Sequence, residues 1–182
     1  MTGVAAHAYG SVPLAESHDV SKFSCGVEEL DDWLRNNATH AAAMNTARTF
    51  IWAEADGVVV AYYSLAGHQV VREEMPHRLA RGSPNQIPSV LIGKLALGRT
   101  LQGGERRLGG SLLVDALSRV LVATQQVAAR LVVVDAVDER AVGYYEHFGF
   151  LRTAPDSFRL VRKVSDIAAD FSAAQPGRVK DS

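Results

Sequence analysis

The stretch of sequence that decides the fold is LIGKLALGRTLQGGERRLGGSLLVDAL, residues 91–117. Its beginning, Leu91–Leu97, is mostly apolar and is typical of a strand with at least one buried face. The segment Gln102–Gly110 is rich in glycine and arginine, and from about Ser111 apolar residues recur at helical spacing. This order of strand, glycine-rich turn and helix exposes a helix N-terminus, whose unpaired N–H groups and positive dipole end suit an anion.

Two interpretations of the turn remain open from its residues alone. Its glycines let the backbone approach a phosphate closely, and Arg106 and Arg107 add charge and forked donors, which is what pyrophosphate binding requires. The alternative is a glycine-rich connector with two solvated arginines, because a lone glycine motif is weak evidence. The turn is not a P-loop, since no Gly-Lys-Ser/Thr closes it. It is also too long for the dinucleotide fingerprint, and no matching βαβ unit precedes it.

The residues before this stretch predict strands that pair antiparallel. From Val27 a helix is well supported, because apolar residues recur at helical spacing as far as Ala42. Asp56-Gly57, the strongest short hairpin signal, separates two segments rich in β-branched and aromatic residues. The segments predicted as strands are Arg48–Ala55 and Val58–Ala66, with a first strand around Tyr9–Leu14. Met75–Pro88 is polar with three prolines, which indicates an exposed excursion.

The residues after the stretch predict alternating strands and helices. Leu131–Asp135 begins with a continuous apolar run, which is typical of a central buried strand. Asp138 can cap a helix over Glu139–His147 that Gly149 ends. A strand over Phe158–Lys163 and a helix over Val164–Phe171 complete the chain. Such alternation requires at least one parallel pair. We therefore predict a mixed α/β fold with a central, mostly antiparallel sheet flanked by helices, as one domain over residues 1–174 with a flexible tail at 175–182.

Composition excludes several classes of protein. The 182 residues carry a formal net charge of −1, so no bulk basic field points to nucleic acid. The single cysteine, Cys25, cannot build a disulfide framework or a cysteine zinc site, which favours the cytoplasm. The histidines show no metal-ligand spacing, so we expect no metal. The N-terminus lacks a secretory signal, and no run reaches the about 18 apolar residues of a membrane span, so we expect no membrane association.

Several motifs in order resemble the GNAT acetyltransferase superfamily, and within it the acetyltransferase toxins of bacterial toxin–antitoxin pairs. The residues that carry the resemblance are Phe23-Ser24-Cys25-Gly26, Leu30-Asp31-Asp32-Trp33-Leu34, Ala61-Tyr62-Tyr63-Ser64-Leu65, Gly93-Lys94-Leu95-Ala96-Leu97, Leu108-Gly109-Gly110-Ser111-Leu112-Leu113, Val133-Val134-Asp135-Ala136 and Ala141-Val142-Gly143-Tyr144-Tyr145-Glu146-His147-Phe148-Gly149-Phe150. The similarity covers roughly Val12 to Phe171, and the ordered combination is far more specific than any single motif.

The resemblance implies the GNAT fold, acetyl-CoA as co-substrate and direct attack of a primary amine on the thioester. The backbone of Leu95, Ala96 and Leu97 would pair with the pantetheine arm. The N–H groups of Leu108, Gly109, Gly110 and Ser111 would hold the pyrophosphate, with Arg106 and Arg107 beside them. The turn departs from the family pattern by about two extra residues, and Arg107 stands where a glycine is customary. Which of Gly103, Gly104 and Arg106 touches phosphate is therefore left open.

Tyr145 is the residue that the resemblance identifies as general acid for the departing CoA thiolate. A phenol near its reference pKa of ~10 stays protonated at neutral pH and can supply that proton. From the residues alone, the alternative is a core tyrosine that packs beside Phe148 and Phe150. Tyr144 is interpreted as a packing residue.

No general base is assigned. Four residues are candidates only by type, and the amine of an aminoacyl ester is acidic enough to need none. These candidates are Glu54, Glu73, His68 and Asp135. His147 is interpreted as complementing the dipole at a helix C-terminus. Cys25 is interpreted as a small buried or capping residue and not as a nucleophile.

The acceptor follows only from the resemblance to the toxins, which implies the amino group of aminoacyl-tRNA and a block of translation. Arginines and lysines are available for its phosphates: Arg48, Arg72, Arg78, Arg81, Lys94, Arg99, Arg106, Arg107, Arg152, Arg159, Arg162 and Lys163. The expected protein partners are a ribbon-helix-helix antitoxin and a second copy of the chain in a homodimer. The alternatives are acetylation of a small-molecule or protein amine, and a non-catalytic CoA-binding module.

Overall fold

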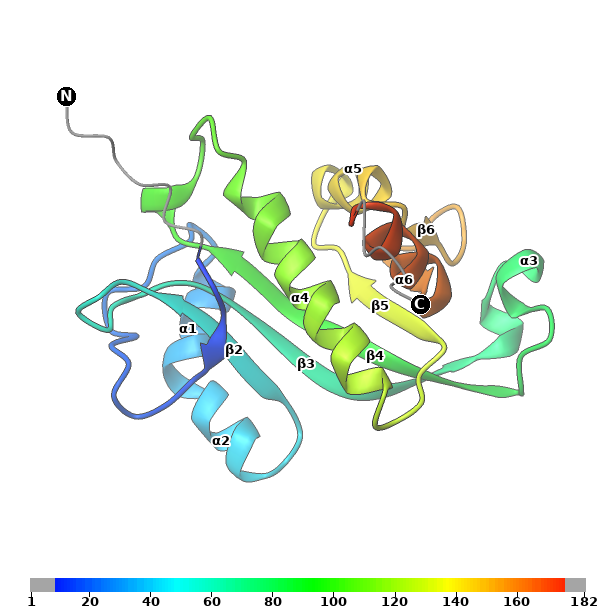
Figure 1. Cartoon of the computed structure of the whole chain (residues 1–182), viewed down its shortest axis with the longest axis horizontal. Coiled ribbons are helices and arrows are strands. Elements are labelled where there is room, and N and C mark those ends of the chain that lie inside the picture. Colours follow the sequence, from blue (N-terminus) through cyan, green and yellow to red (C-terminus); the bar gives the residue numbers. More distant parts are fainter. Residues whose placement is uncertain (1–8, 176–182) are drawn as a thin grey trace, which may run out of the picture. The chain divides into compact units, whose positions relative to one another are not determined.

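The computed structural model describes residues 9–175 (Figure 1). These residues fall into two compact units. Among the described residues, unit 1 takes in 9–65 and Lys94–Ala116, and unit 2 takes in Ala66–Gly93 and 117–175. The strands form a seven-stranded sheet in the order β1-β2-β3-β4-β5-β7-β6. The β4–β5 pair is parallel, whereas the β1–β2, β2–β3, β5–β7 and β6–β7 pairs are antiparallel. The predicted mixed sheet is thereby confirmed.

Unit 1 begins with the short edge strand β1 (Val12–Pro13) and contains the predicted hairpin. Strand β2 (Arg48–Ala53) pairs with the first part of β3 (Val59–Val71), and between them Gly57 has φ +85. Glycine adopts this left-handed conformation without strain, which is why Asp56-Gly57 turns the chain here. Strand β1 is shorter than the predicted Tyr9–Leu14, although the N–H of Leu14 still bonds to the carbonyl of Thr49 at 3.0 Å.

The single helix predicted from Val27 is in fact two helices, α1 (Glu28–Asn36) and α2 (Ala38–Ala43). The break lies at Asn37, whose φ of −120° is outside the helical range, and asparagine is a weak helix former. The helices bury Leu34 and Ala38 in the core of unit 1. Other members of this core are Phe23, Cys25, Ile51, Val59, Tyr62 and Ala96.

The end of β4 (Gln86–Leu97) leads into the 3-10 turn η2 (Arg99–Leu101) through a tight contact at Gly98. The N–H of Gly98 donates to the carbonyl of Val60 at 2.8 Å. A Cβ at position 98 would lie 2.7 Å from that carbonyl oxygen, so only glycine allows the backbones to approach this closely. Helix α4 (Leu108–Thr124) follows, beginning three residues before the predicted Ser111.

Unit 2 is built around β5 (Leu131–Asp135), whose first four residues are fully buried as predicted for a central strand. It pairs with β4 from Ser89 to Ile92 and with β7 (Arg159–Lys163) along its whole length. The remaining elements are α5 (Glu139–His147), β6 (Leu151–Arg152) and α6 (Val164–Ala173). The predicted cap of α5 is present, because Asp138 accepts a hydrogen bond from the N–H of Ala141 at 2.8 Å.

The prediction of an exposed excursion over Met75–Pro88 is partly wrong. After the 3-10 turn η1 (Arg72–Glu74), this segment forms α3 (His77–Ala80) and then begins β4 at Gln86. Its apolar side chains pack in the core of unit 2, which contains Val70, Met75, Leu79, Ala80, Ile87, Leu131, Val133 and Val161. Pro76, Pro84 and Pro88 therefore lie in a segment that is packed within unit 2 and is not an exposed excursion. Strand β6, with only two residues, was too short to be predicted from pattern.

The predicted tail and the predicted single domain stay predictions. Most of the tail predicted at 175–182 lies outside the described residues, and the division into a single domain over 1–174 stays a prediction. Among the described residues, no helix combines the length and the apolar character that crossing a membrane requires.

Candidate active site

The last residues of β4 lie in unit 1, past the final pair of the β4–β5 ladder at Ile92. This is where the pantetheine arm was expected, at Leu95–Leu97. The carbonyl of Leu97 already accepts a hydrogen bond of 2.6 Å from Nε2 of Gln102, which also donates to the carbonyl of Cys25 at 2.8 Å. A carbonyl oxygen has two lone pairs, so Leu97 retains one for a ligand.

Gln102 was not singled out from the sequence, and its two contacts explain its place in the turn. Its amide points into the base of the turn and ties it to the loop before α1. One of the two partners, Cys25, is 77 residues away in the sequence, so no local pattern could have revealed the contact.

The glycine-rich turn ends in a left-handed residue that is not glycine. Arg107 has φ +46, so an arginine occupies the conformation that a glycine takes more easily. Its carbonyl accepts a hydrogen bond from the N–H of Gly110 at 3.1 Å. The N–H of Gly110, one of the four predicted to face pyrophosphate, therefore already has a partner inside the helix start. Leu108, Gly109 and Gly110 together form the first turn of α4, with Ser111 next.

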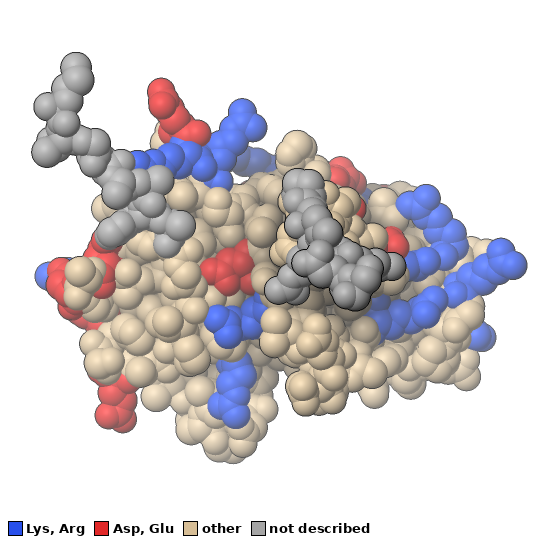
Figure 2. All heavy atoms as spheres, in the orientation of Figure 1, with Lys and Arg blue, Asp and Glu red and all other residues tan. Residues whose placement is uncertain are grey.

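Positive charge gathers at this turn. Arg106 and Arg107 are exposed, and neither belongs to an ion pair within the described part of the chain. Figure 2 shows basic side chains over the turn, with acidic atoms beside them. The charge of Arg106 also reaches Tyr9, where it opposes the rise in the phenol pKa caused mainly by a hydrogen bond to Glu54. The turn thus offers two free guanidinium groups beside a helix N-terminus, an arrangement that suits a diphosphate.

Tyr145 lies in unit 2, on the buried face of α5. Its ring meets Tyr144 and Phe150 edge-on, with centroid distances of 5.2 and 5.7 Å. Burial, helped by the negative charge of Asp135, raises the pKa of Tyr145 to about 12. Its hydroxyl forms no hydrogen bond with any residue from 9 to 175. The phenol is therefore neutral at physiological pH and keeps its proton available.

Asp135 and His68, two candidates for a general base, are both held by Arg159. The guanidinium of Arg159 binds both oxygens of Asp135, and its Nη1 lies 3.2 Å from Nε2 of His68. Because an arginine can only donate, Nε2 is the unprotonated nitrogen of a neutral imidazole. Burial and then the charge of Arg159 lower the pKa of His68, and the hydrogen bonds from Arg159 lower the pKa of Asp135. Neither group is free to take a proton from an incoming ammonium.

The remaining candidates have other surroundings. Glu54 accepts a hydrogen bond of 2.6 Å from the hydroxyl of Tyr9, and Glu73 lies in the exposed turn η1. The thiol of Cys25 is buried, and this burial raises its pKa to about 11, which leaves it unreactive as a nucleophile. The ring of His147 contacts Phe148 edge-on at 5.3 Å.

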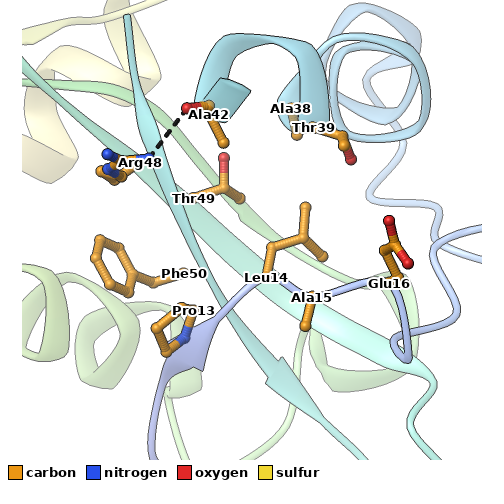
Figure 3. Close-up of a pocket in the computed structure, with 10 residues that line it drawn as sticks. All are labelled: Pro13, Leu14, Ala15, Glu16, Ala38, Thr39, Ala42, Arg48, Thr49 and Phe50. Carbon is orange, nitrogen blue, oxygen red and sulfur yellow. Dashed lines mark hydrogen bonds between the residues drawn. The ribbon is translucent and has the colours of Figure 1, made fainter. Parts of the chain in front are cut away.

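A pocket of about 430 Å³ opens in unit 1 (Figure 3), and none of the residues predicted to bind acetyl-CoA lines it. Its walls come from the segment after β1, from α2 and from β2. At its edge Nη1 of Arg48 donates to the carbonyl of Ala42 at 3.0 Å. In its wall the hydroxyl of Thr49 is buried and has no hydrogen-bond partner in the described structure. Residues 9–175 hold no group of three or more side chains that could bind a metal ion.

The arginines considered for tRNA divide into paired and unpaired groups. Arg152 pairs with Glu139 and Glu146, and Arg162 pairs with Asp170. Lys94 lies 3.5 Å from Glu29 in unit 1. Arg78 and Arg81, on and just after α3, take part in no ion pair among the residues that the structure describes. Within unit 2, Arg78 and Arg81 are therefore available to phosphate, whereas Arg152 and Arg162 are held by acidic side chains.

Comparison with known proteins agrees with this fold. No model of a protein family matches the chain. The chain is 34% identical over 156 residues to a tRNA-acetylating toxin of Mycobacterium tuberculosis, which covers 86% of this chain and 92% of that protein. It is 28% identical over 143 residues to the probable toxin TacT of Sinorhizobium fredii, covering 73% and 78% of the two chains. The solved structure of AtaT complexed with acetyl-methionyl-tRNAfMet superposes with a TM-score of 0.80 at 26% identity, covering 88% of this chain and 98% of AtaT.

The fold and the likeness to proteins that acetylate tRNA define an acetyltransferase of the GNAT type. The likeness to the curated toxins extends over most of both chains. The chain belongs to the acetyltransferase toxins of toxin–antitoxin systems.

Proposed function

We propose that this enzyme transfers the acetyl group of acetyl-CoA to the amino group of aminoacyl-tRNA and thereby blocks translation. The observation that carries the proposal is the 34% identity, over 86% of the chain, to a protein named for acetylating tRNA. The complex of AtaT with an acetylated aminoacyl-tRNA adds support, because AtaT shares the fold at a TM-score of 0.80.

Acetyl-CoA would be held by unit 1. Leu95, Ala96 and Leu97 would offer backbone groups to the pantetheine arm, and the N–H groups at Leu108, Gly109 and Ser111 would face the diphosphate. Arg106 and Arg107 would neutralise part of its charge. The exposed arginines and the helix N-terminus support this assignment, as does the AtaTR structure bound with acetyl-CoA, at 26% identity. Gly110 has a smaller part than expected, because its N–H is already bonded.

Tyr145 would act as the general acid. The acceptor nitrogen attacks the thioester carbonyl carbon, an N–C bond forms, and the C–S bond breaks to release CoA thiolate. Tyr145 gives its phenol proton to that sulfur, the product ammonium loses a proton to water, and water reprotonates the phenol. A neutral phenol with a pKa of about 12 and an unbonded hydroxyl is suited to this step. Solvent takes the amine proton, because Arg159 occupies both His68 and Asp135.

The assignment also predicts partners. We propose a ribbon-helix-helix antitoxin as the inhibitor, a homodimer as the assembly and the cytoplasm, where charged tRNA is found, as the location. The solved structures of AtaT bound to the C-terminus of the antitoxin AtaR, and of the AtaT–AtaR complex with DNA, support an antitoxin partner. Light scattering of the purified chain, alone and with the product of the neighbouring gene, tests both assemblies.

The decisive experiment supplies acetyl-CoA labelled in its acetyl group. Charged tRNA, uncharged tRNA, polyamines, antibiotics and peptides are offered in parallel. We expect label only on charged tRNA, recovered as an N-acetyl amino acid after the ester is hydrolysed. Label on a small amine or a peptide with none on charged tRNA would overturn the tRNA assignment. No transfer to any acceptor, together with acetyl-CoA binding, would indicate a non-catalytic binding module.

A further inference from the structure

Asp115 joins three distant segments of unit 1 to helix α4. Its Oδ1 lies 2.6 Å from Oγ of Ser11 and 3.0 Å from the hydroxyl of Tyr63. Its Oδ2 accepts from Nε1 of Trp52 at 2.8 Å and from the N–H of Ser11 at 3.1 Å. Every lone-pair direction of the carboxylate is therefore used, by groups 52 to 104 residues away in the sequence.

The partners of Asp115 are themselves fixed. The side chains of Trp52 and Tyr63 are 2% and 0% exposed. Tyr9 stacks on Trp52 with a centroid distance of 5.1 Å, and its hydroxyl donates to Glu54 at 2.6 Å. Ser11 directly precedes the edge strand β1. Asp115 thus links helix α4 to buried residues of β2 and β3 and to the segment of residues 9–11.

The position of Asp115 on α4 relates these hydrogen bonds to the proposed diphosphate site at the start of the helix. Leu108, Ser111 and Asp115 are spaced i, i+3 and i+7, so they lie on one face of α4. The helix rises about 1.5 Å per residue, which places Asp115 about 10 Å from the first turn. Between Leu108 and Asp115 the helix carries two glycines, Ser111 and apolar side chains, whose packing is less directional than the hydrogen bonds of Asp115.

We propose that Asp115 is a positioning residue for acetyl-CoA. By bonding to Ser11, Trp52 and Tyr63 it fixes the rotation and axial position of α4, and so the direction in which the N–H groups at Leu108–Ser111 point. The inference rests on the proposed diphosphate site but needs no particular acceptor.

The test compares two variants of Asp115 and two acetyl donors, acetyl-CoA and acetyl-pantetheine. Asp115→Ala removes all four contacts. Asp115→Asn can keep them, because its oxygen can accept from Trp52 and from the Ser11 N–H while its amide donates to the two hydroxyl oxygens. We expect Asp115→Ala to weaken acetyl-CoA binding, measured by calorimetry, by about tenfold or more. Asp115→Asn should stay within about threefold of the wild type. Asp166→Asn, an exposed acid on α6, is the matched control.

Acetyl-pantetheine, which lacks the diphosphate, separates positioning from a general loss of structure. In Asp115→Ala the KM for acetyl-CoA should rise with little change in kcat, whereas kcat/KM for acetyl-pantetheine should equal that of the wild type. A lower melting temperature with unchanged acetyl-CoA affinity would overturn the proposal, as would equal losses with both donors. If Asp115→Ala does not fold, Ser11→Ala and Trp52→Phe can replace it, because each removes one side chain that donates a hydrogen bond to Asp115. Acetyl-CoA affinity equal to that of the wild type in both variants would also refute the proposal.

Failure of the proposed function gives a different result. If the wild type binds acetyl-CoA but acetylates no tRNA, the calorimetric comparison of the variants still decides the role of Asp115. If the wild type does not bind acetyl-CoA at all, both the proposed acetyl transfer and the proposed role of Asp115 are refuted.

Discussion

The guanidinium of Arg159 holds both carboxylate oxygens of Asp135, from Nε to Oδ1 at 2.7 Å and from Nη2 to Oδ2 at 2.8 Å. The two residues face each other at the last register position of the β5–β7 ladder. The same guanidinium reaches His68 on β3, so three strands of unit 2 share one polar contact.

Removing this contact should destabilise the protein in a pH-dependent way. Arg159→Ala should cost about 1 kcal/mol at pH 7, a modest value because both side chains are partly exposed. Arg159 lowers the pKa of Asp135 in the folded state, so its contribution is present above the unfolded pKa near 4 and is lost as the pH falls below it. Urea unfolding at pH 7 and pH 3 measures the difference. The same gap at both pH values would contradict the assignment.

Tyr145→Phe should lower kcat by about 10²–10⁴-fold, because the variant cannot protonate the thiolate. Its stability should change little, since the Tyr145 hydroxyl bonds to no described residue. The protonated phenol is the active form and its pKa is about 12, so the wild-type rate should show no decline from this group up to about pH 10.

Tyr144→Phe is the matched control for that prediction. It removes a hydroxyl from the neighbouring ring and should leave acetyl transfer close to the wild-type rate. A loss in Tyr144→Phe as large as in Tyr145→Phe would assign the acid to the wrong tyrosine. Both rates are measured with charged tRNA across pH 6–10.

Replacing Arg107 should change stability and acetyl-CoA affinity in opposite directions. Its left-handed φ of +46 costs a side-chain-bearing residue about 1 kcal/mol, so Arg107→Gly should raise the free energy of unfolding by up to that amount. The loss of a positive charge should weaken acetyl-CoA binding. Arg106→Gly is the control, because Arg106 is not among the residues with positive φ. If both variants were stabilised equally, backbone strain at position 107 would not be the cause.

Thr49→Val should stabilise the protein by about 1 kcal/mol, because it replaces a buried hydroxyl without a partner by a methyl group of similar size. Thr39→Val, in the same pocket wall but exposed, should not. Chemical denaturation of the two variants measures the effect. A loss of stability in Thr49→Val would mean that the hydroxyl is bonded in solution, for example by water.

The elements that could be predicted from sequence are those with local causes. The Asp56-Gly57 hairpin follows from a turn that requires φ > 0, and β5 follows from an unbroken apolar run. The break at Asn37 and the burial of Met75 and Leu79 could not be predicted, because packing partners elsewhere in each unit decide them.

The same division holds for the candidate site. The helix start at Leu108–Ser111 has a glycine signature that can be recognised in the sequence. The contacts of Gln102, Asp115 and Arg159 depend on partners up to 77, 104 and 91 residues away, and a single sequence carries no signal for them.

The turn before α4 is held by hydrogen bonds at both ends, while the two glycines in its middle face open space. Gly98 and Gln102 anchor its beginning, and Arg107 directly precedes α4, whereas an added Cβ at Gly103 or Gly104 would meet no atom within 4 Å. A change of length at Gly103 and Gly104 therefore extends into open space, so the surplus over the family pattern can be accommodated there without moving strand or helix. The junction between these two glycines is accordingly where a short epitope or a fluorophore-binding peptide could be inserted with the fold intact.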